Sequence, residues 1–205
     1  MTNDYHLSTM QLDALREVAH IGAGNAAKGL SELLKKRIQL HLPSAQLMDF
    51  AKVSEFLGGA GQNVAAVFFD VKGKAAGSIL LIFPMKEALR LSDLLLARPK
   101  GQTIMGLDEM GESCLKEIGN ICCGCYLSVL SEMTRMKLAH SVPGLAIDML
   151  EAVLDGVLSQ LSLVVDKALI LETRLDVQGE KVCGHFLFLP DPEGLRAILE
   201  ALQVE

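Results

Sequence analysis

The sequence predicts an α+β fold: a single domain in which an antiparallel sheet is packed with long helices. Three observations lead to this expectation. The chain has 205 residues, of which 50% are hydrophobic and 21% charged, so it can bury a core and is not disordered. Two long segments have helical periodicity, and two others have the pattern of β-hairpins. Because these segments recur in the same order, we expect one domain over residues 1–205, built from two pseudo-two-fold related repeats at about 8–100 and 108–205.

The internal repeat appears when the sequence is compared with itself. A shift of 100 residues aligns 15–43 with 115–143 without gaps, and a shift of 106 residues aligns 69–84 with 175–190. Identical residues recur at several positions of both alignments. Two copies are too few for a solenoid, so the repeat indicates a duplicated unit inside one domain.

Each repeat is expected to begin with a long helix, over residues 8–36 and 108–136. Ser8 and Gln11 form a capping-box pattern at the start of the first helix. Glycines inside both helices lower the helix propensity, so we expect a kink or close packing at these points. In the second helix, apolar side chains recur every three or four residues and predict one buried stripe: Leu115, Ile118, Ile121, Cys122 and Cys125.

The remaining elements follow in the same order in both repeats. Short strands flank Pro43 and Pro143, and then come a short helix, a hairpin and a closing helix. In the first repeat these span 51–57, 63–83 with a turn at Lys72-Gly73, and 85–96; in the second they span 148–157, 162–189 with a turn at Gln178-Gly179, and 192–202. Long hairpins beside helices predict an antiparallel sheet covered by helices.

Charge and hydropathy exclude several classes of partner. The net charge is −6, and the one basic cluster, at residues 35–37, suits the C-terminal end of a helix. Nucleic acid is not an expected partner, because phosphate contacts need clustered lysine and arginine. No run of about 18–20 apolar residues predicts a membrane span. The first ten residues lack the basic and apolar regions of a secretory signal, so we expect a cytoplasmic protein.

Cysteines are grouped in the second half of the chain. Cys122 and Cys125 have the C-x-x-C spacing that metal and redox sites use. A zinc site would need a second pair of ligands at suitable spacing, and the sequence contains none. These cysteines fall in the predicted second helix, where small buried thiols are expected. We therefore expect reduced thiols and no metal site.

Three polar residues lie on one face of the predicted second helix: Ser113, Glu117 and Asn120, at positions i, i+4 and i+7. At 100° per residue they fall within about 60° of one another and point away from the apolar stripe. By spacing alone, they fit either a functional surface or an ordinary solvated helix face.

The pattern Ser/Asp-x3-Glu-x2-Asn-x22-Pro, present twice, resembles the motif of the CheC/CheX/FliY phosphatases of bacterial and archaeal chemotaxis. Ser113, Glu117, Asn120 and Pro143 match it at every position. Two motif copies without an appended flagellar-switch domain make the chain most similar to CheC. The resemblance covers essentially the whole chain.

The first repeat departs from the motif at one position. Asp13, Glu17 and Pro43 match it, but His20 replaces the asparagine. A neutral imidazole can hold a water molecule with a different geometry, whereas a protonated one has no acceptor nitrogen left. The resemblance therefore implies a second, degenerate site at Glu17 and His20 that is weak or silent. Alternatively, His20 is an ordinary exposed helix residue.

The resemblance implies a hydrolase that removes the aspartyl-phosphate of a CheY-type response regulator. The regulator would supply the acyl phosphate, a Mg²⁺ ion and a lysine, so the phosphatase needs no cofactor of its own. Asn120 would orient the attacking water, because a carboxamide accepts and donates hydrogen bonds without bringing negative charge. Glu117 would pair with the regulator's lysine, and Gly119 would let the partner's backbone approach closely.

Other motif residues are expected to support this site. Ser113 and Asp13 would stabilise the helix or the interface. Pro43 and Pro143 would shape the strand beside the helix.

A second partner and a second function stay open. CheC proteins also bind the receptor deamidase CheD, which raises CheC activity, through a short helix that residues 146–155 resemble. Asp148 is therefore a candidate partner-binding residue, or a carboxylate that stabilises the N-terminus of this helix. In the alternative function, the protein is a non-catalytic module that sequesters a response regulator or regulates CheD without turnover.

Overall fold

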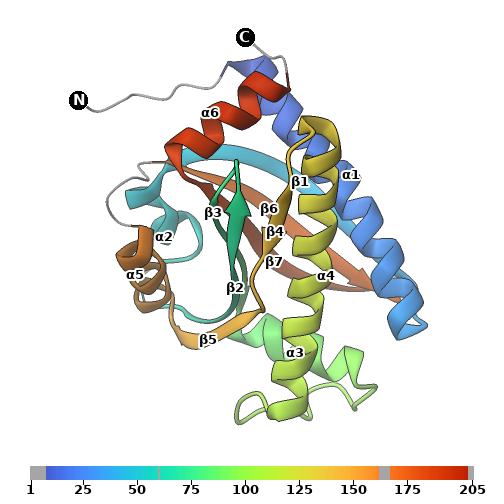
Figure 1. Cartoon of the computed structure of the whole chain (residues 1–205). Helices are drawn as coiled ribbons and strands as arrows, with labels where there is room; N and C mark the ends of the chain where they lie inside the picture. The colour runs from blue at the N-terminus through green and yellow to red at the C-terminus, as the bar shows by residue number, and fades with distance from the viewer. Residues whose placement is uncertain (1–7, 60, 162–166, 203–205) are drawn as a thin grey trace.

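Helices and strands cover most of the described residues, which are 8–59, 61–161 and 167–202 of the computed structural model (Figure 1). The helices are α1 (Thr9–Leu34), α2 (Val53–Phe56), α3 (Met85–Leu95), α4 (Glu109–Thr134), α5 (Leu150–Leu161) and α6 (Pro192–Ala201), and a 3₁₀ turn, η1 (Phe50–Lys52), precedes α2. The strands are β1 (Ile38–Asp49), β2 (Asn63–Gly73), β3 (Gly77–Pro84), β4 (Leu138–His140), β5 (Gly144–Met149), β6 (Lys167–Val177) and β7 (Glu180–Pro190). Residues 1–7 of the N-terminal segment and residues 162–166 of the predicted second hairpin lie outside the described part. Within that part, no helix is both long enough and apolar enough to cross a membrane.

The seven strands of the described residues form one antiparallel sheet. Its order is β1-β6-β7-β3-β2, and β4 and β5 both pair with β2 at the far edge. Strand β1 of the first half therefore pairs with β6 of the second, while β4 and β5 of the second half pair with β2 of the first. The halves exchange edge strands, and β3 and β7 join them at the centre. The predicted α+β class is confirmed; the division into two-fold related repeats stays a prediction.

Both faces of the sheet are buried under helices. Figure 1 shows α1 and α4 side by side on one face and α2 and α5 on the other. In β2, Ala65 and Val67 belong to the core on the α1–α4 face, whereas Val64 and Ala66 belong to the core with α2 and α5. Because helices cover both sides, the central strands carry nearly continuous apolar runs.

Helices α1 and α4 run antiparallel and in close contact. Gly22 of α1 lies against Tyr126 of α4, so a Cβ atom at Gly22 would be 3.1 Å from the Tyr126 Cα. Further along, a Cβ atom at Gly29 would be 3.6 Å from Cγ2 of Ile121. Later positions of α1 thus meet earlier positions of α4. The close packing predicted at the helix glycines is confirmed at Gly22, where a side chain would push the helices apart.

The ends of both long helices lie within two residues of the predicted ends. The Ser8 hydroxyl accepts a hydrogen bond from the Gln11 N–H (3.2 Å), and Gln11 Oε1 accepts one from the Ser8 N–H (2.9 Å), which confirms the capping box. Asp108 caps α4 by accepting a hydrogen bond from the backbone N–H three residues on (2.9 Å). Lys35 and Arg135, with φ of 50° and 55°, end the helices in the left-handed conformation.

A buried carboxylate organises the connection from α3 to α4. Asp93 is 3% exposed and accepts hydrogen bonds from the Gly101 N–H (3.0 Å) and from the N–H (3.2 Å) and hydroxyl (2.5 Å) of Thr103. Arg98 donates to both carboxylate oxygens of Asp108 (3.2 and 2.7 Å), and this hydrogen bonding lowers the pKa of Asp108 from its usual value. The start of α4 is thereby fixed relative to α3.

The first hairpin turn is longer than the predicted Lys72-Gly73 turn. The last pair of β2 with β3 is Val71 with Gly77, so residues 72–76 connect the two strands, and Lys72-Gly73 begins this connection. Strand β2 continues to Gly73 because β4 pairs with it there, opposite Leu138. The second turn, at Gln178-Gly179, is confirmed: both residues have positive φ, 54° and 91°, as a two-residue type I′ turn requires.

Replacing Gly119 by alanine is expected to destabilise the fold. A Cβ atom there would lie 2.7 Å from Cγ1 and 3.1 Å from Cβ of Val67, whose branched side chain has little freedom to move. We expect Gly119→Ala to lower the free energy of unfolding by about 1–2 kcal/mol, because overpacking outweighs the gain in helix propensity. Urea denaturation followed by circular dichroism measures this change.

The matched control is Gly24→Ala in α1, where no atom lies within 4 Å of the added Cβ. This substitution should raise the free energy of unfolding by about 0.5–1 kcal/mol, because only helix propensity changes. Equal effects of the two substitutions would contradict the close contact at Gly119.

Candidate functional site

The outer face of α4 presents the second copy of the sequence motif. Ser113 and Glu117 are exposed and Asn120 is partly exposed. Leu115 and Ile118, which alternate with them along the helix, are 0% and 3% exposed and pack toward the sheet. The helical period therefore separates polar from apolar side chains as the sequence predicts.

The side chains of Glu117 and Asn120 are not engaged within the described part of the protein: no hydrogen bond or ion pair there involves the carboxylate or the carboxamide. A helix holds their backbones rigidly, about 4.5 Å apart along its axis at 1.5 Å per residue. The pair can thus receive a partner that brings a cation and a hydrogen-bonding group.

Glu117 also borders a concave apolar surface, which we call the leucine hollow. It has a volume of about 180 Å³, lies between the ends of α1 and α3 and the first turns of α4, and opens to solvent. Its lining consists of Leu30, Leu33, Leu34, Leu95, Ser113, Cys114, Glu117 and Ile118. This surface was not predicted from the sequence. The one available signal was Leu33, an apolar residue that follows Glu32 on the polar side of the helix.

The first motif copy lies on the outer face of α1 and does not meet the second. Asp13, Glu17 and His20 are all exposed. Asp13 forms an ion pair with Arg16 of its own helix at 3.0 Å. Because α1 and α4 are antiparallel, Glu17 and His20 lie beside the C-terminal half of α4, roughly 13–22 Å along the helix pair from their counterparts. The structure therefore contains two separate candidate sites.

The role expected for Gly119 was wrong. The residue is buried, and a Cβ atom there would lie 2.7 Å from Val67 and 3.3 Å from Phe69. It faces β2 and leaves no space for a partner's backbone. Its absent side chain instead brings α4 close to the sheet, which sets the height at which Glu117 and Asn120 stand.

Both motif prolines lie where an edge strand is interrupted. Pro143 lies between β4 and β5, after Ser141, whose N–H donates to the Asp70 carbonyl of β2 (2.9 Å). Pro43 lies in β1 where the register with β6 shifts, between His41 and Ser44. Proline has no N–H for a sheet, so it is tolerated at such breaks.

Asp148 lies in β5 and not on a helix, so its predicted place at a helix N-terminus was wrong. It pairs with Val64 of β2, and α5 begins only at Leu150. The carboxylate is exposed and accepts a hydrogen bond from the next N–H, that of Met149 (2.7 Å). Ile147 and Met149 beside it are 42% and 50% exposed.

Two of the cysteines of α4 lie in the core. Cys122 and Cys123 are buried, and desolvation raises the pKa of Cys122 to about 12 and that of Cys123 as well. Both thiols stay protonated near neutral pH and are poor nucleophiles or ligands. Among the described residues, no three histidine, cysteine or acidic side chains come together to hold a metal ion.

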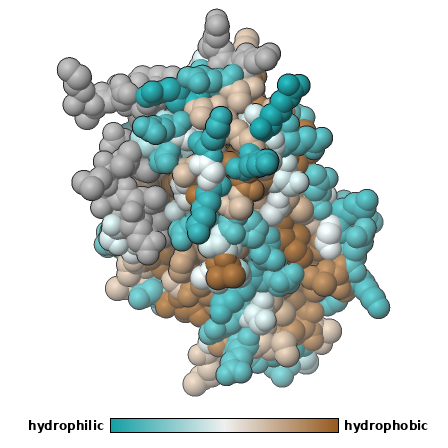
Figure 2. Space-filling view, in the orientation of Figure 1, coloured by the Kyte–Doolittle hydropathy of each residue, from teal (hydrophilic) through white to brown (hydrophobic). Residues whose placement is uncertain are grey.

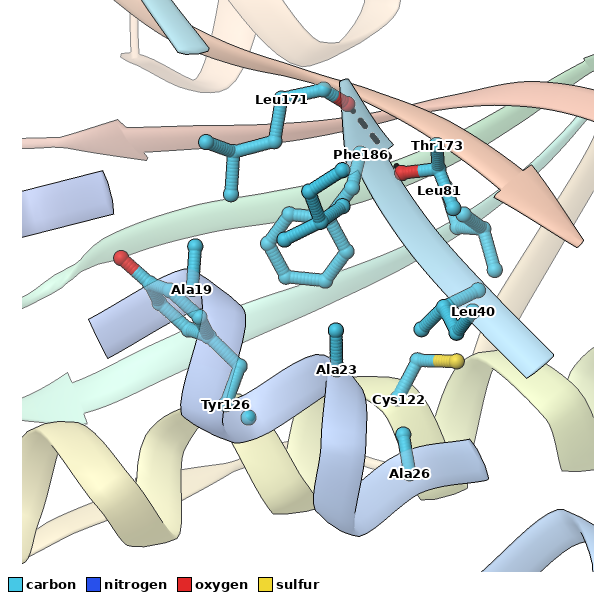
Figure 3. Close-up of a pocket in the computed structure, with 12 residues that line it drawn as sticks. Ala19, Ala23, Ala26, Leu40, Leu81, Cys122, Tyr126, Leu171, Thr173 and Phe186 are labelled. Carbon is cyan, nitrogen blue, oxygen red and sulfur yellow. Dashed lines mark hydrogen bonds between the residues drawn. The ribbon is translucent and has the colours of Figure 1, made fainter. Parts of the chain in front are cut away.

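A second, small cavity, of about 20 Å³, lies between α1, α4 and the sheet (Figure 3). Ala19 and Ala23 of α1 and Tyr126 of α4 contribute to its wall. The Thr173 hydroxyl already donates to the Leu171 carbonyl (3.2 Å). No charged group lines this cavity, so it is unsuited to a phosphate or a metal.

Comparisons with known proteins agree with the motif. Residues 10–43 and 110–147 match the model of the CheC-like family. Over 195 residues the chain is 35% identical to the CheY-P phosphatase CheC of Bacillus subtilis (strain 168). This alignment covers 94% of this chain and 93% of the relative.

Solved structures share the fold. The FliY structure from Thermotoga maritima has a TM-score of 0.78 at 20% identity, covering 97% of this chain and 98% of that one. A chain of the CheX-CheY-BeF3-Mg²⁺ complex from Borrelia burgdorferi has a TM-score of 0.51 at 17% identity, covering 85% and 97%. With a close relative aligned over nearly its whole length, the protein belongs to the CheC-like family.

Proposed function

We propose that this protein is a phosphatase that hydrolyses the aspartyl-phosphate of a CheY-type response regulator. The observation that carries the proposal is the placement of Glu117 and Asn120, unengaged, on the outer face of α4. Family membership supports it, since the relative at 35% identity is named a CheY-P phosphatase. The expected cytoplasmic location fits a soluble regulator as substrate, and it stays a prediction.

Asn120 has the chemistry to place the nucleophile. The attacking water must lie in line with the bond between phosphorus and the aspartate oxygen, which breaks as the new P–O bond forms. A carboxamide oxygen accepts a hydrogen bond from the water, and its NH₂ group donates a second hydrogen bond. Because the group is neutral, it adds no repulsion toward the phosphoryl oxygens. Positioning of this kind lowers the barrier without a covalent intermediate on the phosphatase.

Glu117 has the chemistry to orient the partner. Its carboxylate, one turn from Asn120, can pair with the lysine that the regulator is expected to hold beside its phosphoryl group. Such a pair becomes desolvated when the surfaces meet and thus fixes the register of the complex. The Mg²⁺ ion is expected to come with the regulator, and Ser113 and Pro143 are expected to support the helix and the adjoining strand.

The α1 site is proposed to contribute little. His20 offers one acceptor nitrogen when neutral and none when protonated, and Asp13 is already paired with Arg16. Pro43 interrupts β1 as Pro143 interrupts the opposite edge. Glu17 is exposed and is expected to bind a regulator weakly.

A CheD-type deamidase is proposed to bind at the β5 edge around Asp148. The exposed carboxylate there lies between two half-exposed apolar residues, Ile147 and Met149. An apolar surface with one charge is typical of a protein interface. This edge lies on a different element from the α4 site.

Removing the Asn120 carboxamide is expected to abolish most of the activity. The full-length protein, in substoichiometric amount, is added to a phosphorylated CheY-type regulator with Mg²⁺, and phosphate release is followed. We expect many turnovers per molecule, and a loss of about 100-fold in kcat for Asn120→Ala, the order seen when one positioned hydrogen-bonding group is removed. His20→Ala should change the rate less than twofold. An unchanged rate for Asn120→Ala would refute the mechanism, and release limited to one equivalent would favour the sequestering module.

Neutralising Glu117 is expected to weaken binding of the regulator. We expect Glu117→Gln to raise the dissociation constant for a beryllofluoride-activated regulator by about 30-fold, because one buried charge then lacks its partner. Glu17→Gln, at the corresponding exposed position of α1, is the matched control and should change binding less than twofold. Titration calorimetry separates the two outcomes. Equal effects would show that Glu117 does not face the regulator's lysine.

A further inference from the structure

The leucine hollow adjoins the proposed site and has no role in it so far. Of its eight lining residues, Ser113 and Glu117 are polar or charged, and the others are apolar. Figure 2 shows hydrophobic residues gathered among hydrophilic ones where α1 and α4 lie side by side. A concave apolar surface that opens to solvent is typical of a binding site.

The leucine hollow is preformed, because contacts fix the three helix ends around it. Lys36, just after α1, donates a hydrogen bond to the Leu94 carbonyl near the end of α3. Asp93 and the Arg98–Asp108 ion pair tie α3 to the start of α4. A surface that is rigid before binding avoids the entropic cost of ordering.

Leu33 shows that the hollow is not simply part of the core. Its side chain is 54% exposed, whereas Leu30 and Leu95 in the same lining are 1% and 8% exposed. The deeper leucines stabilise the packing of α1 and α3. Leu33 leaves much of its apolar surface in water, where a partner would be needed to cover it.

We propose that the leucine hollow is a docking pocket for an aliphatic or aromatic side chain of the response regulator. The inference rests on the proposed phosphatase function. Glu117 forms one wall of the hollow, so a regulator whose lysine pairs with Glu117 must also cover the hollow. When Glu117 is paired with that lysine, a charged or amide side chain in the hollow would lose its hydration with only the Ser113 hydroxyl left to replace it. An apolar side chain gains free energy on burial. The hollow thus contributes to the affinity for the regulator, while Asn120 contributes to the rate of phosphate hydrolysis.

The corresponding surface of the first repeat is more polar and provides a control. At positions 100 residues away, Thr134 corresponds to Leu34 and Asp13 to Ser113. Asp13 is paired with Arg16, which leaves a charged cluster in place of a small hydroxyl. Met133 corresponds to Leu33 and is 39% exposed. The same substitution can therefore be made at two exposed apolar positions of one helix pair.

The test compares Leu33→Ser with Met133→Ser in the full-length protein. Both positions are exposed, and thermal unfolding by circular dichroism verifies that both variants fold. For Leu33→Ser we expect the dissociation constant of a beryllofluoride-activated CheY-type regulator, and the KM with its phosphorylated form, to rise about five- to tenfold. The kcat should stay within twofold. Met133→Ser should change none of these quantities.

The outcomes separate this inference from the proposed function. Unchanged binding by Leu33→Ser, or an equal loss in both variants, would overturn the docking pocket, even if phosphate release still depends on Asn120. A loss in kcat without a change in KM or in the dissociation constant would also overturn it. If no variant turns over phosphate, the binding measurement alone decides, and the failure then belongs to the proposed function.

Discussion

The contact between Gly119 of α4 and Val67 of β2 is the constraint on which the candidate site depends. With hydrogen as its side chain, Gly119 lets the helix lie against the strand, and every residue of α4 takes its height above the sheet from that contact. Gly22 plays the same part between α1 and α4. Close-packed interiors transmit small displacements, so the height of Glu117 and Asn120 above the sheet depends on contacts made on the buried side of the helix.

Two kinds of interaction fix the position of α4. Its inner face is packed in the apolar core. Its first turn is fixed by the hydrogen bonds of Asp93 and by those between Arg98 and Asp108. These hydrogen bonds do not involve Glu117 or Asn120 on the outer face. A rigid support with unengaged polar groups on its far side is what positional catalysis requires, since groups that are already paired cannot respond to a partner.

The sequence was informative where periodicity and local chemistry decide the structure. It predicted both long helices, the Ser8 capping box, the Gln178-Gly179 turn and the exposure of Glu117, since each depends on a few neighbouring residues. It failed where distant segments decide. The end of β2 is set by pairing with β4, the start of α5 by pairing of Asp148 with Val64, and the orientation of Gly119 by β2. The leucine hollow is formed by residues of three helices, so no local sequence pattern predicts it.

The exchange of edge strands between the halves has a consequence for how such a chain can diverge. Strand β6 is covered on one side by β1, and β2 is covered by β5. A shortened descendant lacking either half would expose a long unpaired strand and invite aggregation. The two halves of the chain are therefore held together by strand pairing, whichever of them carries a site. A change on the outer face of α1, such as one at His20, leaves this pairing intact, because β1 and not that helix face makes it.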